Sequence, residues 1–244
     1  MGRFDGKVVL VTGSSSGIGE AAAQHFADAG ATVVINSATS VAAGEAVASR
    51  LPGATYCQAD VSDPAAAAAL VDHVLSAHGR LDVLVNNAGT TKVIPHHDLD
   101  AITDEVFRRI IDVNLFGTWQ LTHLALPHLK AHGDGSVVNV TSVAGVRATG
   151  SSIPYAVSKA ALNHLTVLLA NVVGPEVRMN AVAPGLVRTP WTEDWGPIHD
   201  MIGERAPLGR SGEPDDIAEV IVDVAGASYL TGQVIVVDGG LTLA

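Results

Sequence analysis

The sequence is poor in the features that mark secreted, disordered and membrane-spanning proteins. Its 244 residues include a single cysteine, Cys57, which excludes an internal disulfide and is typical of a reducing cytosol. Only 4% of the residues are aromatic and 16% are charged, whereas 48% are hydrophobic, which excludes a disordered chain. No apolar run reaches the roughly 18 residues that span a bilayer, and the first residues lack the apolar core of a signal peptide. We therefore expect a cytoplasmic globular protein.

Basic residues are also scarce. Lys and Arg together number 14 against 25 Asp and Glu, which gives a formal net charge of −11. A surface of this sign repels phosphate backbones and anionic lipids, so we expect neither nucleic acid nor a membrane among the partners. The 10 histidines do not indicate a metal site. His128 and His132 lie four residues apart near a predicted helix end, but no third ligand follows at a suitable spacing.

Short β-branched runs alternate with longer Ala-rich segments along the chain. The runs are almost continuously apolar, as in parallel strands that are buried on both faces. Strands are predicted at residues 7–12, 32–36, 54–59, 81–86, 135–141, 177–182 and 233–237, and helices at 17–29, 40–51, 64–78, 103–131, 154–173 and 214–225. This alternation predicts an α/β fold, with one doubly wound Rossmann-type domain over residues 1–244 and a seven-stranded, mostly parallel sheet that has helices on both faces.

Two segments depart from this alternation of strands and helices. Pro127 falls inside the predicted helix 103–131 and should kink that helix or end it early. The segment at about 186–212 is too long for a simple connection, and it contains Trp191 and Trp195. Long loops of this kind often cover binding sites. We expect this segment to be a substrate loop, and its two indoles indicate a substrate with an apolar body.

A glycine-rich turn joins the first predicted strand to the first predicted helix. Residues 12–19 read Thr-Gly-Ser-Ser-Ser-Gly-Ile-Gly, so Gly13, Gly17 and Gly19 have the spacing Gly-x-x-x-Gly-x-Gly. Such a turn lets the backbone approach a pyrophosphate, whose charge is then stabilised by the N-terminus of the helix. The alternative is a flexible turn that binds no ligand.

This turn and the motifs that follow it resemble the short-chain dehydrogenase/reductase family. The later motifs, in the order of the family, are Asp60-Val61, Asn86-Asn87-Ala88-Gly89, Asn114, Ser142, Tyr155-x-x-x-Lys159 and Pro184-Gly185. The resemblance covers the chain from Lys7 to Gly240, and the most similar branch is that of the 3-oxoacyl-carrier-protein reductases. It implies an NAD(P)-dependent oxidoreductase that acts on CH–OH or C=O groups.

The resemblance also implies a nicotinamide dinucleotide site. The residues of this site would be Gly13, Ser15, Ser16, Gly17, Ile18, Gly19, Asn36, Ser37, Asp60, Val61, Asn87, Ala88, Gly89, Tyr155, Lys159, Pro184, Gly185, Val187 and Thr189. Asp60 would bind the adenine amine, and Thr189 would bind the nicotinamide carboxamide or the pyrophosphate. Two alternatives stay open, because Asp60 could cap a turn and the amides of Asn86 and Asn87 could bind loop backbone.

The residues after the second predicted strand bear on the choice between NADP and NAD. NAD-dependent enzymes usually carry an Asp or Glu there, which binds the ribose 2′-hydroxyl. Residues 36–40 read Asn-Ser-Ala-Thr-Ser, so no acid repels a 2′-phosphate, and Asn36, Ser37 and Thr39 could donate hydrogen bonds to it. Arg and Lys are absent as well, and the nearest basic residue downstream is Arg50. The sequence therefore favours NADP, with NAD as the alternative.

Tyr155 and Lys159 carry the predicted chemistry. They lie four residues apart on a predicted helix and therefore share one face. A neighbouring ammonium favours the phenolate, so Tyr155 is expected to donate a proton to a carbonyl oxygen or to accept one from a hydroxyl. By the resemblance, Lys159 also binds the nicotinamide ribose, Ser142 donates to the substrate oxygen, and Asn114 distorts its helix and holds a water that relays protons. Asn114 could instead be a simple polar residue within the helix.

Charge and resemblance also bear on the substrate and the assembly. The helix 154–173 has no basic residue except Lys159, and like charges oppose docking of an acidic carrier protein. We therefore expect a small free ketone or secondary alcohol as substrate. The resemblance implies a homotetramer or homodimer that packs the helices at 103–131 and 154–173. The alternative function is a sensor or scaffold that binds NADP without turnover, although such proteins usually lose the Tyr/Lys pair that is intact here.

Overall fold

The structure is a computed structural model that describes residues 2–243, and a seven-stranded sheet forms its centre. The strands are β1 (Val8–Val11), β2 (Thr32–Ser37), β3 (Thr55–Gln58), β4 (Val83–Asn86), β5 (Gly135–Val140), β6 (Val177–Pro184) and β7 (Val234–Val237). They lie in the order β3-β2-β1-β4-β5-β6-β7, and every neighbouring pair is parallel. The predicted fold class is confirmed, and the sheet is entirely rather than mostly parallel over the described residues.

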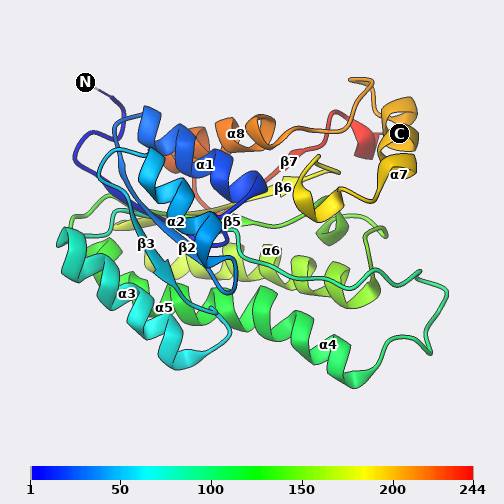
Figure 1. Ribbon diagram of the computed structural model, residues 1–244, viewed down its shortest axis with the longest axis horizontal. Helices are drawn as coiled ribbons and strands as arrows, with labels where there is room; N and C mark the ends of the chain where they lie inside the picture. Colours follow the sequence, from blue (N-terminus) through cyan, green and yellow to red (C-terminus); the bar gives the residue numbers. More distant parts are fainter. Residues whose placement is uncertain (1, 244) are drawn as a thin grey trace.

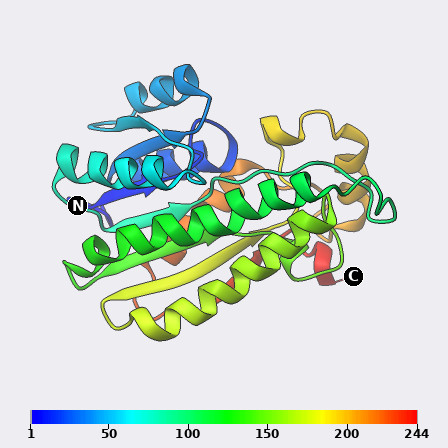
Figure 2. The ribbon, with the colours of Figure 1, turned by 90° about the horizontal axis from the view of Figure 1, so that it is seen from below.

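Helices cover both faces of this sheet (Figures 1 and 2). They are α1 (Gly17–Asp28), α2 (Val41–Arg50), α3 (Pro64–His78), α4 (Asp104–Ile111), α5 (Thr118–Lys130), α6 (Ile153–Val173), α7 (Gly196–Arg205) and α8 (Pro214–Gly226). Phe26 of α1 and Ile221 of α8 belong to the buried core on one face. Leu70 of α3 and Leu121 of α5 belong to the core on the other. The central strands β1, β4 and β5 are thus buried on both sides, as their apolar runs predict, whereas the edge strands β3 and β7 are partly exposed.

The predicted helix 103–131 is one continuous helical stretch with an irregular centre. α4 passes into a π-helix, η1 (Asp112–Gly117), which contains Asn114 and leads directly into α5. The predicted distortion at Asn114 is therefore confirmed. The stretch does not end at Pro127, because α5 continues to Lys130 and its last turns are held by the fully buried side chains of Ala125 and Leu129.

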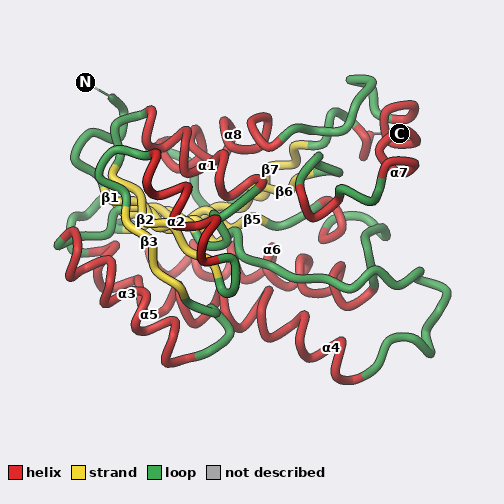
Figure 3. The backbone as a smooth tube through the Cα atoms, in the orientation of Figure 1, coloured by secondary structure: helices red, strands yellow, loops and turns green. Residues whose placement is uncertain are grey.

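The segment after β6 contains more regular structure than the sequence analysis predicts. A 3₁₀ turn, η3 (Pro190–Thr192), is followed by α7, which the prediction missed. Pro197 occupies the first turn of α7, where a missing N–H costs no helical hydrogen bond. Figure 3 shows this segment at the same end of the molecule as the long connection between β4 and α4. Two further 3₁₀ turns are η2 (Val143–Gly145) and η4 (Leu241–Leu243).

By length and composition, α6 is apolar enough to cross a membrane. Several observations assign its apolarity to packing within the fold instead. Its Leu162 and Val173 are buried, and the helix carries the buried Lys159. α6 also contacts β6 along the sheet. We therefore treat α6 as a core helix.

Candidate active site

Parallel strands place all their carboxyl ends at one edge of the sheet, and a cavity of about 890 Å³ opens there. Its walls come mainly from the segments that follow β1, β2, β3, β4, β5 and β6. With two exceptions, the predicted site residues line this one cavity. The exceptions are Gly19 and Asn114, which lie behind its wall and are discussed below.

The glycine turn between β1 and α1 forms one wall. Gly13 has a φ of 62°, and a Cβ on it would lie 2.9 Å from the Cα of Ala88. A Cβ on Gly19 would collide with the Gly13 carbonyl oxygen, so both positions need glycine for close packing. Ser16 precedes α1 but makes no side-chain capping hydrogen bond, whereas the Asp63 carboxylate caps α3 through two backbone N–H groups. The uncapped N–H groups at the start of α1 fit the pyrophosphate of a dinucleotide.

Asn36 does not have the role that the sequence analysis gives it. Its side-chain Nδ2 donates to the carbonyl oxygens of Cys57 and Ala59, both at 3.1 Å, and its Oδ1 accepts from the Gly13 N–H at 3.4 Å. The residue is almost completely buried. The expectation that Asn36 donates to a 2′-phosphate is therefore wrong, because both of its donors already bind backbone across the sheet edge.

Ser37 is also engaged within the protein. Its hydroxyl lies 2.9 Å from the Tyr56 hydroxyl, with either oxygen as donor. The exposed polar groups at this end of the cavity therefore come from Thr39 and Ser40. Arg50 is turned toward Glu20, with which it forms an ion pair.

Asp60 caps a turn, as in one of the roles that the sequence leaves open, and its place in the cavity wall is compatible with the other. Its carboxylate accepts from the N–H and the hydroxyl of Ser62, which caps a turn, and it also lines the cavity. Arg109 of α4 donates to the same carboxylate at 3.1 Å and to the Ser62 hydroxyl at 3.0 Å. Burial raises the pKa of Asp60, but the hydrogen bonds from Ser62 and Arg109 outweigh it and hold the pKa below its usual value. Arg109 was not among the predicted site residues, because nothing in the sequence joins it to Asp60.

Asn87 ties the turn after β4 to the glycine turn. Its Nδ2 donates to the backbone oxygens of Thr12 and Gly13 at 2.9 and 3.0 Å. The amide thus binds loop backbone, as in the alternative that the sequence leaves open. Ala88 and Gly89, which follow it, line the cavity.

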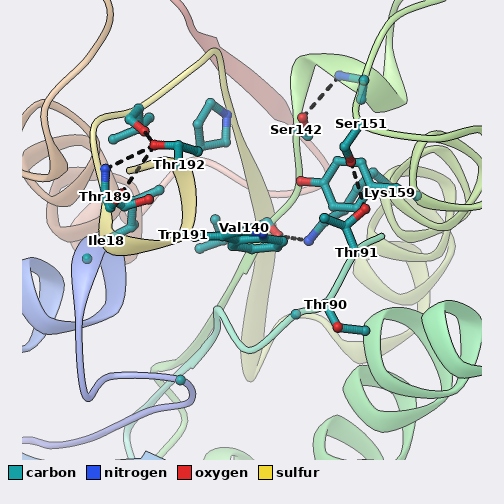
Figure 4. A pocket seen from close by; sticks show the side chains of 18 of the residues that line it. Ile18, Thr90, Thr91, Val140, Ser142, Ser151, Lys159, Thr189, Trp191 and Thr192 are labelled. Atoms are coloured by element: carbon teal, nitrogen blue, oxygen red, sulfur yellow. Dashed lines mark hydrogen bonds between the residues drawn. The ribbon is translucent and has the colours of Figure 1, made fainter. Parts of the chain in front are cut away.

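Tyr155 and Lys159 come together at the other end of the cavity, as predicted. Both lie in the first turns of α6, which begins after Ser152, whose hydroxyl accepts from the Tyr155 N–H. The Lys159 Nζ lies 5.7 Å from the centre of the Tyr155 ring and donates to the Val140 carbonyl oxygen at 2.8 Å (Figure 4). That is the one hydrogen bond of this ammonium in the described structure, so two of its three N–H groups are available to a ribose hydroxyl.

Burial is the main cause of the pKa shifts of both Tyr155 and Lys159. Burial lowers the pKa of Lys159 from 10.5 to about 8. Burial also raises the pKa of Tyr155, against which a hydrogen bond with the Ser142 side chain acts in the opposite direction. The phenol is therefore protonated at neutral pH, and its acidification by the neighbouring ammonium during the reaction stays a prediction.

Asn114 lies beside Lys159 but behind the cavity wall. Its Oδ1 accepts from the Thr90 N–H at 2.8 Å, and its Nδ2 donates to the Thr90 carbonyl oxygen and the Ser158 hydroxyl, both at 3.0 Å. A Cβ on Gly89 would stand 3.4 Å from the Asn114 Oδ1 and 3.7 Å from the Lys159 Nζ. The Asn114 amide therefore joins the loop after β4 to α6 and fixes the surroundings of the lysine.

The segment after β6 completes the cavity. Pro184, Gly185 and Val187 line it, and the Thr189 side chain packs against Gly17 of the glycine turn. α7 also lines the cavity, with side chains that were not among the predicted site residues: Ile198, Met201 and Ile202. Their spacing of three and four residues was the signal that could have revealed this helix.

Comparisons with known proteins agree with this geometry. Residues 13–242 match the family model described as enoyl-(acyl carrier protein) reductase. The chain is 56% identical over 239 residues to a protein of Streptomyces violaceoruber named as a ketoacyl reductase of granaticin polyketide synthase, covering 97% of this chain and 96% of that one. It is 39% identical over 248 residues to 3-oxoacyl-(acyl-carrier-protein) reductase of Thermotoga maritima, covering 99% and 100%.

Solved structures show the same likeness. A short-chain dehydrogenase/reductase from Brucella melitensis superimposes with a TM-score of 0.93 at 32% identity, covering 100% of this chain and 99% of that one. These matches extend over nearly the whole chain. The chain therefore belongs to the short-chain dehydrogenase/reductase family, whose members are nicotinamide-dependent oxidoreductases of CH–OH and C=O groups.

Proposed function

We propose that the chain transfers a hydride between a nicotinamide cofactor and a carbonyl or secondary alcohol substrate, with Tyr155 as the general acid or base. The observation that carries this proposal is the pairing of Tyr155 with Lys159 in the same cavity as the glycine turn. The relatives described above have reductase and dehydrogenase names. They lend no support to the alternative of a sensor or scaffold without turnover.

The protein's own side chains transfer the proton in this reaction. A bound nicotinamide supplies or accepts the hydride. Because burial keeps the Tyr155 phenol protonated, it is ready to donate to a carbonyl oxygen during reduction. Lys159, with a pKa of about 8, is mostly charged at neutral pH, and its ammonium favours the phenolate that proton donation leaves behind. Ser142, on the same wall, would donate a second hydrogen bond to the substrate oxygen.

The cofactor residues that we propose are those of the cavity wall, together with Gly19 behind it. Ser15, Ser16 and Ile18 lie at the start of α1, where the pyrophosphate fits, and the carboxylate of Asp60 is ionised and able to accept from an adenine amine. The Lys159 ammonium would donate to the nicotinamide ribose. Asn36 acts indirectly, by holding the Gly13 backbone in place.

We favour NADP over NAD. The cavity lining next to β2 contains no carboxylate that would repel a 2′-phosphate, within residues 36–40. The hydroxyls of Thr39 and Ser40 are exposed there, and Ser40 leaves the first N–H groups of α2 without a side-chain cap. Because no cation lies beside these donors, we expect a modest preference for NADP, with NAD still able to bind.

The substrate that we propose is a small, free ketone or secondary alcohol. Residues 186–212 would serve as its loop within one cofactor-binding domain that spans residues 1–244. The net charge of −11 would repel an acidic carrier protein, which argues against a carrier-bound substrate. Arg108 of α4 and Lys130 of α5 are exposed basic residues that such a carrier could still reach.

We further propose a homotetramer in the cytoplasm. The helical stretch of η1 and α5 exposes Phe116 and Trp119, and α6 exposes Leu168 and Val172. Val172 is 66% exposed and Phe116 is 58% exposed, which is unusual for large apolar side chains on regular elements. Burial between copies would remove these surfaces from water.

A panel of ketones and secondary alcohols tests the reaction. The absorbance of the reduced nicotinamide is followed with NADPH or NADH for ketones, and with the oxidised cofactors for alcohols. We expect turnover with at least one compound and tighter binding of NADPH than of NADH. Tight cofactor binding without turnover of any compound would contradict the proposed reaction and favour a binding protein.

A further inference from the structure

The indole of Trp191 lies against the ring of Tyr155. The two ring centres are 6.2 Å apart and the ring planes meet at 84°, which is an edge-to-face contact. Trp191 belongs to η3 and lines the cavity, and it is 49% exposed, so one side of the indole still faces open space. In Figure 4 its side chain lies between the Thr189–Thr192 segment and the side chains of Ser142 and Lys159.

The position of Trp191 is held by its neighbours in the chain. The next residue, Thr192, donates from its hydroxyl to the Val187 carbonyl oxygen at 2.7 Å. The buried ring of His199 has Nε2 3.2 Å from that same hydroxyl and Nδ1 2.9 Å from the Ser211 hydroxyl. His199 thus connects η3, α7 and the segment that returns to α8. The hydrogen bonds of Thr192 and His199 therefore fix the backbone that carries the indole and hold the indole beside the phenol.

Apolar side chains form much of this end of the cavity wall, together with hydroxyls such as those of Thr91, Ser151 and Thr192. The apolar side chains that line it include Val93, Ile94, Trp195, Ile198, Met201 and Leu241. Over the part of the chain that the structure describes, the Lys and Arg side chains in the cavity wall are those of Lys159 and Arg109. Lys159 donates to Val140 beside the phenol, and Arg109 is bound to Asp60 at the far end. Once Lys159 binds the nicotinamide ribose, a substrate carboxylate or phosphate would find no Lys or Arg side chain of the wall to pair with, and much of its desolvation cost would be uncompensated.

We propose that Trp191 is a specificity-determining residue that selects uncharged substrates whose reacting carbon belongs to, or adjoins, a ring. This inference rests on the proposed function, because it takes the Tyr155 hydroxyl as the partner of the substrate oxygen. A substrate oxygen at that hydroxyl places the reacting carbon next to the phenol, and any ring attached to this carbon meets the indole. A flat ring gains an aromatic contact there, whereas a short acyclic chain leaves the indole in contact with water.

Two uncharged ketones test the proposal with NADPH. 2-Tetralone carries its carbonyl in a ring, and 2-butanone is acyclic. We expect the parent to favour 2-tetralone in kcat/KM, and Trp191→Ala to lower this preference about tenfold, mainly by raising KM for 2-tetralone. The loss in kcat/KM with 2-butanone should be clearly smaller than the loss with 2-tetralone, because a short acyclic chain makes less contact with the indole. Trp191→Phe should restore most of the preference, since it returns an aromatic face.

Leu208→Ala is the matched control. Leu208 belongs to the same segment and is 70% exposed, but it lies outside the cavity lining, so the preference should stay as in the parent. Equal losses for both ketones in Trp191→Ala, or an unchanged preference, would overturn the proposal while the reaction itself stands. A parent that prefers 2-butanone would overturn it as well. If the parent reduces neither these ketones nor any other of the panel, the proposed function fails first.

Discussion

Replacing Lys159 with methionine should stabilise the protein at neutral pH while it removes activity. Burial lowers the pKa of this ammonium from 10.5 to about 8, so folding takes a charge out of water. The cost is fully present below pH 8, where the lysine is charged in both states, and it declines as the pH rises from 8 to 10.5. This shift corresponds to about 3 kcal/mol at pH 7 and to roughly 1.5 kcal/mol at pH 9.5.

The loss of the hydrogen bond to Val140 acts in the opposite direction. The buried carbonyl left without its donor costs about 1 kcal/mol, and this loss does not depend on pH. Lys159→Met should therefore raise the free energy of unfolding by about 2 kcal/mol at pH 7 and change it little at pH 9.5. The same variant should lose most of its kcat, because no cation is left to favour the phenolate of Tyr155.

Urea denaturation followed by circular dichroism at the two pH values measures this difference. Lys92→Met is the matched control, since Lys92 is exposed, and its effect should stay within about 0.5 kcal/mol at both pH values. A stability gain that is the same at pH 7 and pH 9.5, or no gain at all, would refute the argument that Lys159 is held charged against the cost of burial.

Two further substitutions test other parts of the site. Thr39→Asp places a carboxylate beside the proposed position of the 2′-phosphate, so the ratio of the dissociation constants for NADPH and NADH should rise about tenfold or more, as measured by cofactor titration. A ratio that stays unchanged would place the phosphate elsewhere. Asn114→Ala removes three hydrogen bonds to Thr90 and Ser158, and it should lower the free energy of unfolding by about 2–4 kcal/mol in urea and reduce kcat as well. A stability equal to that of the parent would show that the π-helix does not depend on this amide.

The sequence predicts the fold and the reacting pair well, because both depend on local patterns. The ends of the predicted strands and helices that the structure contains agree with it to within about two residues. Gly13 and Gly19 are fixed by close backbone approaches that the spacing already shows. Tyr155 and Lys159 meet because a helix brings residues four apart onto one face.

The roles that the sequence analysis misses depend on contacts between distant segments. The amide of Asn36 binds backbone on β3 and in the segment after it, and this contact exists only once the strands are paired. Arg109 reaches Asp60 from a helix 49 residues away. The pKa of Tyr155 reflects its burial in the folded protein, which no spacing in the sequence records.

The edge-to-face contact of Trp191 with Tyr155 is of the same kind. It depends on how the segment after β6 folds back over the cavity, and α7, which holds that segment through His199, was not predicted. A long irregular segment gives a weak periodic signal, so its tertiary position cannot be derived from its residues alone.

The most direct test of the account compares two tyrosine variants. Tyr155→Phe removes the proposed proton donor and leaves the ring in place, whereas Tyr229→Phe makes the same change at a fully exposed position outside the cavity. We predict that Tyr155→Phe lowers kcat by about 10²–10⁴-fold while the dissociation constant for NADPH stays within about twofold, and that Tyr229→Phe matches the parent in both. A Tyr155→Phe variant that turns over as fast as the parent would contradict the central claim that this phenol carries the proton.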